Sequence, residues 1–202
     1  MWQFEVVHPC LTLGIFDLNG DGLPEVMCGT KWYWMTALKA SGKSFWRVNF
    51  GPGCRAFAFG ERNNRCVYVA AGAENGCVAF FTPSGKKIRE FDTGDEVRCL
   101  ASGENGKIWV GSYNGYIYRL DERSAPEMRD LQGGITALCK LPDGGVAAGT
   151  DKGGLFLFGS DFSLRQKYLL PAPVINVIYA DNAVWVIMKD GRLWKIKHNS
   201  NK

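Results

Sequence analysis

The sequence lacks the features that mark membrane, secreted and nucleic-acid-binding proteins. No apolar run approaches the ~18 residues of a membrane-spanning helix. Residues 1–16 contain no basic start followed by an apolar stretch, so no signal segment is predicted. The net charge is only +4, and no run of Lys and Arg occurs. We therefore expect a globular protein with neither a membrane nor a nucleic acid as its partner.

Catalytic motifs are also missing. The chain contains no glycine-rich phosphate turn, no Walker pattern and no GxSxG elbow. There are two histidines, His8 and His198. His8 and Cys10 could form a base and nucleophile pair, but no third group to orient them and no anion hole can be identified. Two carboxylates that converge across a cleft would indicate a sugar-cleaving enzyme, and a sequence does not reveal convergence. A non-enzymatic role is favoured.

The seven cysteines form no CxxC pair, so a zinc knuckle is not expected. Most of them lie in apolar, strand-like runs, where cysteine packs as a small hydrophobic residue. Reduced thiols of this kind favour a cytoplasmic location. The seven are Cys10, Cys28, Cys54, Cys66, Cys77, Cys99 and Cys139.

What the sequence does contain is a repeat, rich in glycine and aromatic residues. Each copy has a strand that ends in small residues, then a tight turn, then a second strand of Val, Ile, Trp, Tyr or Phe. The turn glycines are Gly76, Gly115, Gly153 and Gly191, with Tyr33 in that place in the first copy, at spacings of 43, 39, 38 and 38 residues. A repeat of this length, with no helical periodicity, predicts the four-stranded blades of an all-β propeller.

Small residues recur four positions before these turns, at Gly29, Gly72, Gly111 and Gly149, where we expect neighbouring blades to approach closely. The fifth copy lacks a final strand, and residues 1–8, "MWQFEVVH", resemble the missing one, with Trp2 in the place of Trp46. We predict a single domain of five blades, in which this N-terminal strand closes the last blade and removes exposed edges. The blades span about 9–51, 52–94, 95–133, 134–171, and 172–202 plus 1–8. The alternative is an arc of a larger propeller. A closed ring predicts a monomer and an arc predicts a dimer.

A candidate metal site lies in the first hairpin, "DLNGDGLPE". Oxygen donors recur at alternate positions, and Gly20 and Gly22 allow the chain to curl around a centre. Such a set suits Ca²⁺, which takes six to eight oxygen ligands, better than Mg²⁺. The predicted ligands are Asp17, Asn19, Asp21, the carbonyl of Leu23, and Glu25. We expect one structural calcium ion, because the equivalent hairpins of the other copies lack these donors.

A candidate contact surface lies shortly after the metal site in the sequence. Where other copies have an ordinary turn, the first has Lys31, Trp32, Tyr33 and Trp34. Two interpretations remain open. In one, Trp32 and Trp34 pack on a neighbouring blade as core. In the other, the aromatic residues form a platform for a sugar ring or for an apolar anchor of a partner protein.

The loop "DLNGDGLPEV" resembles the calcium loop of FG-GAP repeats, the blades of integrin α-subunit propellers. The whole chain is similar to the quinoprotein-like (PQQ-like, WD-repeat-like) propellers in strands such as "EVMCGT" and "LKASGKSFWRV". This resemblance implies that the calcium ion braces a blade, and it does not imply a quinone. We expect the propeller to be a binding or scaffolding module for protein or glycan. The alternatives are a propeller domain of a polysaccharide-active enzyme, or a fragment without activity of its own. A calcium loop favours a secreted or periplasmic location, whereas the reduced cysteines favour a cytoplasmic one.

Overall fold

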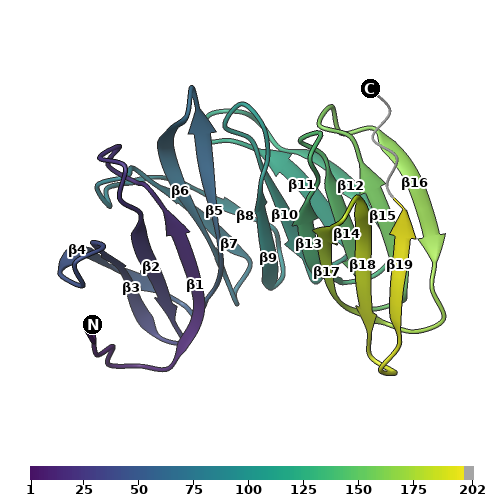
Figure 1. Cartoon of the computed structure of the whole chain (residues 1–202), viewed down its shortest axis with the longest axis horizontal. Helices are drawn as coiled ribbons and strands as arrows, with labels where there is room; N and C mark the ends of the chain where they lie inside the picture. The colour runs from purple at the N-terminus through teal and green to yellow at the C-terminus, as the bar shows by residue number, and fades with distance from the viewer. Residues whose placement is uncertain (198–202) are drawn as a thin grey trace.

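The computed structural model describes residues 1–197. Within that range all nineteen regular elements are β-strands, arranged in five antiparallel sheets (Figure 1). Four sheets have four strands and one has three, which confirms the predicted all-β architecture of five blades. No helix in the described range has the length and apolar character needed to cross a membrane.

We number the blades in chain order, and within each blade consecutive strands are neighbours. Blade one contains β1 (Cys10–Phe16), β2 (Glu25–Thr30), β3 (Tyr33–Leu38) and β4 (Ser44–Gly51). Blade two contains β5 (Cys54–Arg62), β6 (Arg65–Ala73), β7 (Cys77–Phe81) and β8 (Lys87–Asp92). Blade three contains β9 (Val97–Ser102), β10 (Ile108–Ser112), β11 (Tyr116–Leu120) and β12 (Glu127–Asp130). Blade four contains β13 (Ile135–Lys140), β14 (Val146–Thr150), β15 (Gly154–Phe158) and β16 (Leu164–Leu169), and blade five contains β17 (Val174–Ala180), β18 (Ala183–Met188) and β19 (Leu193–Lys197).

Burial changes across each blade in the way that its sequence predicts. The middle strands are apolar on both faces, and every residue of β10 and β14 is buried. The outermost strands are polar, and every residue of β12 is exposed. The first strands of successive blades contact one another and form the inner edge of the assembly. Four apolar clusters fill the four spaces between adjacent blades, so each blade is held mainly by its neighbours.

In the tight turns between the second and third strands, only the glycine of each Asn-Gly or Asp-Gly pair enters the left-handed region, although such pairs favour positive φ at both positions. The four turn glycines have φ between 80° and 96°, in the left-handed region that glycine enters without steric cost. Tyr33, which takes the same place in blade one, has φ of 63°. An aromatic residue in this conformation is unusual, since its β-carbon crowds the backbone.

The glycines expected at the blade junctions are also confirmed. Each one faces the first residue of the next blade, and an added β-carbon would lie 2.7 Å from Cys54 Sγ at Gly29 and 2.5 Å from Val97 Cγ1 at Gly72. The corresponding distances are 2.6 Å to Ile135 Cγ2 at Gly111 and 2.3 Å to Val174 Cγ1 at Gly149. No side chain fits at such separations. Glycine is therefore needed at all four junctions.

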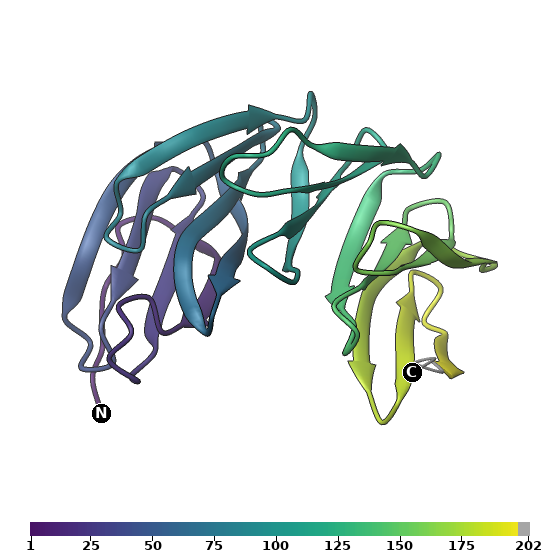
Figure 2. The same ribbon diagram turned by 90° about the horizontal axis from the view of Figure 1, so that it is seen from above.

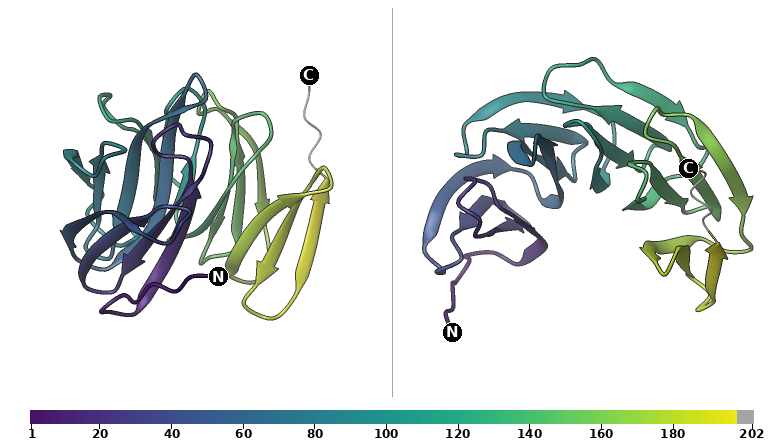
Figure 3. Two further views of the ribbon diagram at one scale, coloured as in Figure 1. Left: turned by 60° about the vertical axis from the view of Figure 1, so that its left-hand side comes forward. Right: turned by 45° about the horizontal axis from the view of Figure 1, so that its top comes forward.

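The predicted closure of the ring is wrong for the described residues. The blades form an open arc, and blades one and five lie at its two ends (Figures 2 and 3). Residues 1–6 form no strand, and β19 has no partner beyond β18. A physical reason lies at the junction position, where the other four blades have glycine. Blade five has Ile187 there, and this residue is 45% exposed. A following blade could not approach there as closely as at the other junctions.

The N-terminal segment lies on blade one instead. Trp2 donates a hydrogen bond from Nε1 to Ala40 O at 2.9 Å and covers Gly42. Trp46 of β4 does the same on blade two, with Nε1 2.8 Å from Pro83 O and the ring over Gly85. The expected likeness of the two tryptophans is therefore real. Trp2 lies against blade one in the way that Trp46 of β4 lies against blade two.

Candidate functional site

The turn between β2 and β3 carries the candidate contact residues, and hydrogen bonds to Thr30 hold its backbone. The buried Thr30 hydroxyl lies 2.7 Å from the carbonyl oxygen of Trp32 and 2.8 Å from that of Trp34. The Trp34 amide donates to Trp32 O at 2.7 Å. These contacts fix a tight turn around Tyr33 and direct the side chains of its central residues outwards.

We call His8, Lys31, Trp32 and Tyr33 the aromatic turn. Trp32 is 46% exposed and Tyr33 is 54% exposed. The His8 ring lies 5.5 Å from the Trp32 ring, edge to face, and 5.9 Å from the Tyr33 ring. Lys31 Nζ lies 4.9 Å from the centre of the Trp32 ring. Trp32 is therefore not a core residue. His8 was not predicted as part of this group, because it joins through the N-terminal segment.

Trp34, the fourth predicted contact residue, lies apart from the aromatic turn. Its side chain is half-buried, and the Arg47 guanidinium lies 4.3 Å from its ring centre. This is a cation–π contact between β3 and β4 within blade one. Trp34 packs against its own blade and does not join the exposed surface formed by Trp32 and Tyr33.

The candidate calcium loop connects β1 and β2 and is closed by its own hydrogen bonds. Asp17 accepts from the amides of Gly20 and Gly22, at 2.7 and 2.8 Å. Asp21 accepts from the amide of Leu23 at 2.8 Å. Both glycines have positive φ, which lets the loop curl around these carboxylates. The loop therefore has the predicted curled form.

Glu25 anchors this loop to the sheet. It is 1% exposed, and its Oε2 accepts from the Leu18 amide at 2.9 Å. Asn19 Nδ2 lies 3.0 Å from Asp21 Oδ2 and 3.0 Å from Glu25 Oε1, so one amide group joins two carboxylates. Within residues 1–197, no three His, Cys, Asp or Glu side chains are already arranged as a metal-binding group. The five predicted ligands share one loop, but the side chains bond to backbone and to one another.

A row of charged residues, which was not predicted, lies near the beginning of the first strands of blades two and three. Arg55 pairs with Glu74 at 2.6 Å and with Glu96 at 3.2 Å, and Arg98 pairs with the same Glu96 at 3.0 Å. The Arg98 guanidinium lies 3.9 Å from the Tyr113 ring centre. This row joins blades two and three near the turns between their second and third strands. Its residues come from different repeats, and a single sequence does not show that they meet.

The row ends in blade four. Asp151 takes the place of Glu74 in the repeat, and Thr136 takes the place of Arg55. Asp151 Oδ1 is buried and has no hydrogen-bond partner among the described residues. It lines a hollow of about 430 Å³ together with Arg98, Tyr113 and Lys189. Because blade four has Thr136 where blade two has Arg55, Asp151 lacks, within the described chain, the cationic partner that Glu74 has.

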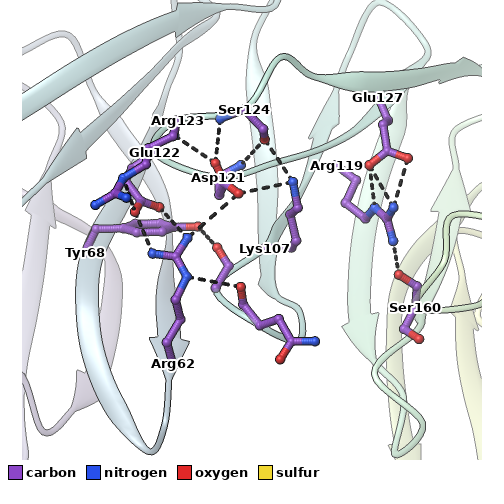
Figure 4. A network of polar contacts seen from close by, with 12 residues as sticks. Arg62, Tyr68, Lys107, Arg119, Asp121, Glu122, Arg123, Ser124, Glu127 and Ser160 are labelled. Carbon is purple, nitrogen blue, oxygen red and sulfur yellow. Dashed lines mark hydrogen bonds and ion pairs between the residues drawn. The ribbon is translucent and has the colours of Figure 1, made fainter.

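On the opposite side of the blades, an ion-pair network joins blades two and three (Figure 4). Arg62 donates two hydrogen bonds to Glu122, at 2.6 and 2.9 Å, and Tyr68 donates to Gly106 O at 2.6 Å. Lys107 Nζ lies 3.1 Å from Asp121 Oδ2. Burial acts to raise the pKa of Asp121, but hydrogen bonds from the amides of Ser124 and Arg123 and from Lys107 outweigh it and hold that pKa below its ordinary value.

The cysteines are free in this structure, and most behave as packing residues. Burial raises the pKa of Cys66 and Cys99 to about 12 and that of Cys77 to about 11. Thiols with such pKa values remain protonated at neutral pH and are poor nucleophiles. Cys10 and His8, the nucleophile and base pair suggested by the sequence, face different neighbours: Cys10 contacts Cys28, and His8 contacts Trp32 and Tyr33.

No protein-family model and no curated protein sequence matches this chain. Solved structures do match in fold. The designed Ika8 protein has a TM-score of 0.77 at 18% identity, over 96% of this chain and 59% of the other. The WD40 β-propeller domain of Doa1 has a TM-score of 0.75 at 16% identity, over 93% and 63%. BBS1N in complex with ARL6DN has a TM-score of 0.73 at 12% identity, over 93% and 66%. The chain has a β-propeller fold and spans about three fifths of the length of these propellers.

Proposed function

We propose that this chain is a protein-binding propeller module whose contact surface is the aromatic turn. The observation that carries the proposal is the exposure of Trp32 and Tyr33, side by side, on a turn where other blades have glycine. Tyr33 has φ of 63°, a conformation that costs a non-glycine residue about 1–3 kcal/mol. The fold supports a protein partner, since one matched propeller, BBS1N, is bound to a protein.

The chemistry of the aromatic turn favours an apolar anchor with an acidic neighbour. Trp and Tyr provide large contact areas at low conformational cost, and they are enriched among the residues that dominate binding energy. Lys31 adds a positive charge beside the Trp32 ring. The partner segment that fits is therefore one with a large apolar side chain next to Asp or Glu.

Affinity capture with matched variants tests this proposal. Proteins retained by the wild-type chain should be lost with the double variant Trp32→Ala and Tyr33→Ala. The control is Leu169→Ala, because Leu169 is 81% exposed and lies on the outer strand of blade four. Thermal melting should show that the double variant remains folded, since neither side chain is buried. Retention of the same proteins by the wild type and by both variants would contradict the proposal, and retention on a glycan array alone would indicate a carbohydrate ligand instead.

We also propose that the loop from Asp17 to Glu25 binds one calcium ion that braces blade one. The donor set supports this, with three carboxylates, one amide oxygen and one backbone carbonyl in nine residues. Glu25 is already buried and fixed, so a cation near it would offset the cost of burying its charge. The ion would supply charge neutralisation and order, not catalysis.

Melting with calcium and with a chelator tests the ion. At a calcium concentration of 100 times Kd, binding adds about 2.7 kcal/mol, or roughly 5–10 °C in the midpoint. Asp21→Ala should remove this calcium-dependent rise. Asp161→Ala is the matched control, since Asp161 lies in a comparable turn and bonds to Ser163. A midpoint that does not change with calcium would exclude a structural calcium ion without bearing on the aromatic turn.

A further inference from the structure

Two cysteine side chains meet at the beginning of blade one. Cys10 is the first residue of β1 and is exposed, while Cys28 lies within β2 and is buried. Their Sγ atoms are 2.8 Å apart. The proposed function uses neither thiol. A free, accessible thiol that contacts a second thiol is the arrangement from which a disulfide forms.

The backbone already brings the two residues into range. β1 and β2 are antiparallel neighbours in one sheet, with Cys10 opposite Thr30 and Leu13 opposite Cys28. The ladder shifts between Cys10 and Thr12, which moves Cys10 towards the Cys28 side chain. A disulfide bond is about 2.05 Å long, so closing the gap requires a shift of less than about 1 Å. Adjacent strands can accommodate such a shift without breaking the sheet.

We propose that Cys10 and Cys28 form a reversible disulfide by exchange with a small-molecule disulfide such as oxidised glutathione. The Cys10 sulfur attacks one glutathione sulfur, the glutathione S–S bond breaks, and one glutathione leaves. The Cys28 sulfur then attacks Cys10 in the mixed disulfide and expels the second glutathione. The two protein thiols are oxidised, the glutathione disulfide is reduced, and the two thiol protons pass to the two glutathione thiolates.

The environment sets the order of these steps. Cys10 is the thiol that a solute can reach, because it is exposed at the strand end. Burial, followed by the contact with Cys10, raises the pKa of Cys28 to about 12, so Cys28 is a poor first nucleophile. Once Cys10 carries glutathione, the short distance favours attack by Cys28. The neighbouring Cys54 is fully buried, so it cannot begin the exchange.

The bond would connect the two candidate regions of blade one. It closes a covalent ring over residues 10–28, and this ring contains the whole loop from Asp17 to Glu25. Cys10 also follows Pro9, whose carbonyl oxygen accepts from the Lys31 amide at 2.9 Å. The disulfide would therefore fix the entry of the N-terminal segment, and with it His8, beside the aromatic turn.

Treatment of the folded chain with oxidised glutathione, followed by thiol counting under denaturing conditions, tests the proposal. Incubation with oxidised glutathione should reduce the free thiols of the wild type from seven to five, and dithiothreitol should restore them. Cys10→Ser removes the first nucleophile, and its six remaining thiols should persist. Cys28→Ser should stop at the mixed disulfide, with one bound glutathione. Cys54→Ser is the matched control and should decrease from six thiols to four.

Peptide mapping identifies the bond. Cleavage after Glu25 and after Lys31 in the denatured, alkylated chain places Cys10, Cys28 and Cys54 in three different peptides, so the disulfide joins two identifiable peptides that dithiothreitol releases. A glutathione-treated wild type that keeps seven thiols would overturn the proposal. So would a wild type that stops at the mixed disulfide, or a bond to Cys54. Cys10→Ser and Cys28→Ser are small substitutions in free thiols, and circular dichroism checks that both variants fold.

Discussion

Replacing Arg62 tests whether the ion-pair network, and not apolar contact alone, holds blades two and three together. Arg62 ends β5 in blade two, and it binds Glu122, which follows β11 in blade three (Figure 4). The Glu122 side chain is 7% exposed and that of Asp121 is 12% exposed. Arg62→Ala leaves both carboxylates buried with fewer cations near them. We expect a clear loss of stability.

The magnitude follows from the burial of each partner. Removing one member of a fully buried pair costs about 3–5 kcal/mol. The Arg62 side chain is 33% exposed, so water partly screens its charge. Arg123 remains 3.4 Å from Glu122, and Lys107 remains beside Asp121, so neither carboxylate is left alone. These two effects reduce the expected cost of Arg62→Ala to about 2 kcal/mol.

Urea denaturation of a double-mutant cycle measures the pair itself. Glu122→Gln removes the buried charge but retains the shape of the side chain, and the double variant with Arg62→Ala completes the cycle. A coupling energy of about 1–2 kcal/mol is expected between the two positions. Raising the salt concentration should have little effect, because buried pairs are weakly screened. A coupling below ~0.5 kcal/mol would refute the reasoning and assign the junction to its apolar cluster.

Three further perturbations test other parts of the fold. Gly72→Ala should cost about 1–3 kcal/mol in urea denaturation, because the new methyl group overlaps Val97 at a buried junction. Tyr33→Gly should raise the melting midpoint by relieving about 1–3 kcal/mol of backbone strain. The pKa of Asp121 is held low, so its contribution to stability is complete above about pH 5 and is lost as the pH falls below about 4. A pH titration of the melting midpoint, compared with Asp121→Asn, measures that contribution.

The repeat framework is predictable from sequence because each blade repeats the same local chemistry. Turn glycines at a spacing of about 40 residues mark the hairpins, and glycines four positions earlier mark the close approach of blades. Both are backbone requirements, so they leave a direct record in residue type. The place of Trp2 in the frame was predictable for the same reason, since its contacts repeat those of Trp46.

Contacts between residues that are distant in the sequence are less predictable. Asp121 and Glu122 look like an acidic, solvated turn in the sequence, yet both are buried against cations from other elements. His8 and Trp32 meet only because the N-terminal segment turns back along blade one. Cys10 and Cys28 meet through a shift in the strand ladder that no residue pattern announces. In each case the partners are far apart in sequence, and the pairing depends on a register that the sequence leaves open.

One residue of the fifth copy does indicate that the ring is open. Aligning the fifth copy on its turn glycine, Gly191, places Ile187 where four other copies have glycine. The requirement for glycine at that place is steric, since the first residue of the next blade occupies the space of a β-carbon. An isoleucine there does not allow the close approach that the four glycines allow. The absence of one glycine therefore carried more information about closure than the likeness between Trp2 and Trp46, which reports only where the N-terminal segment packs.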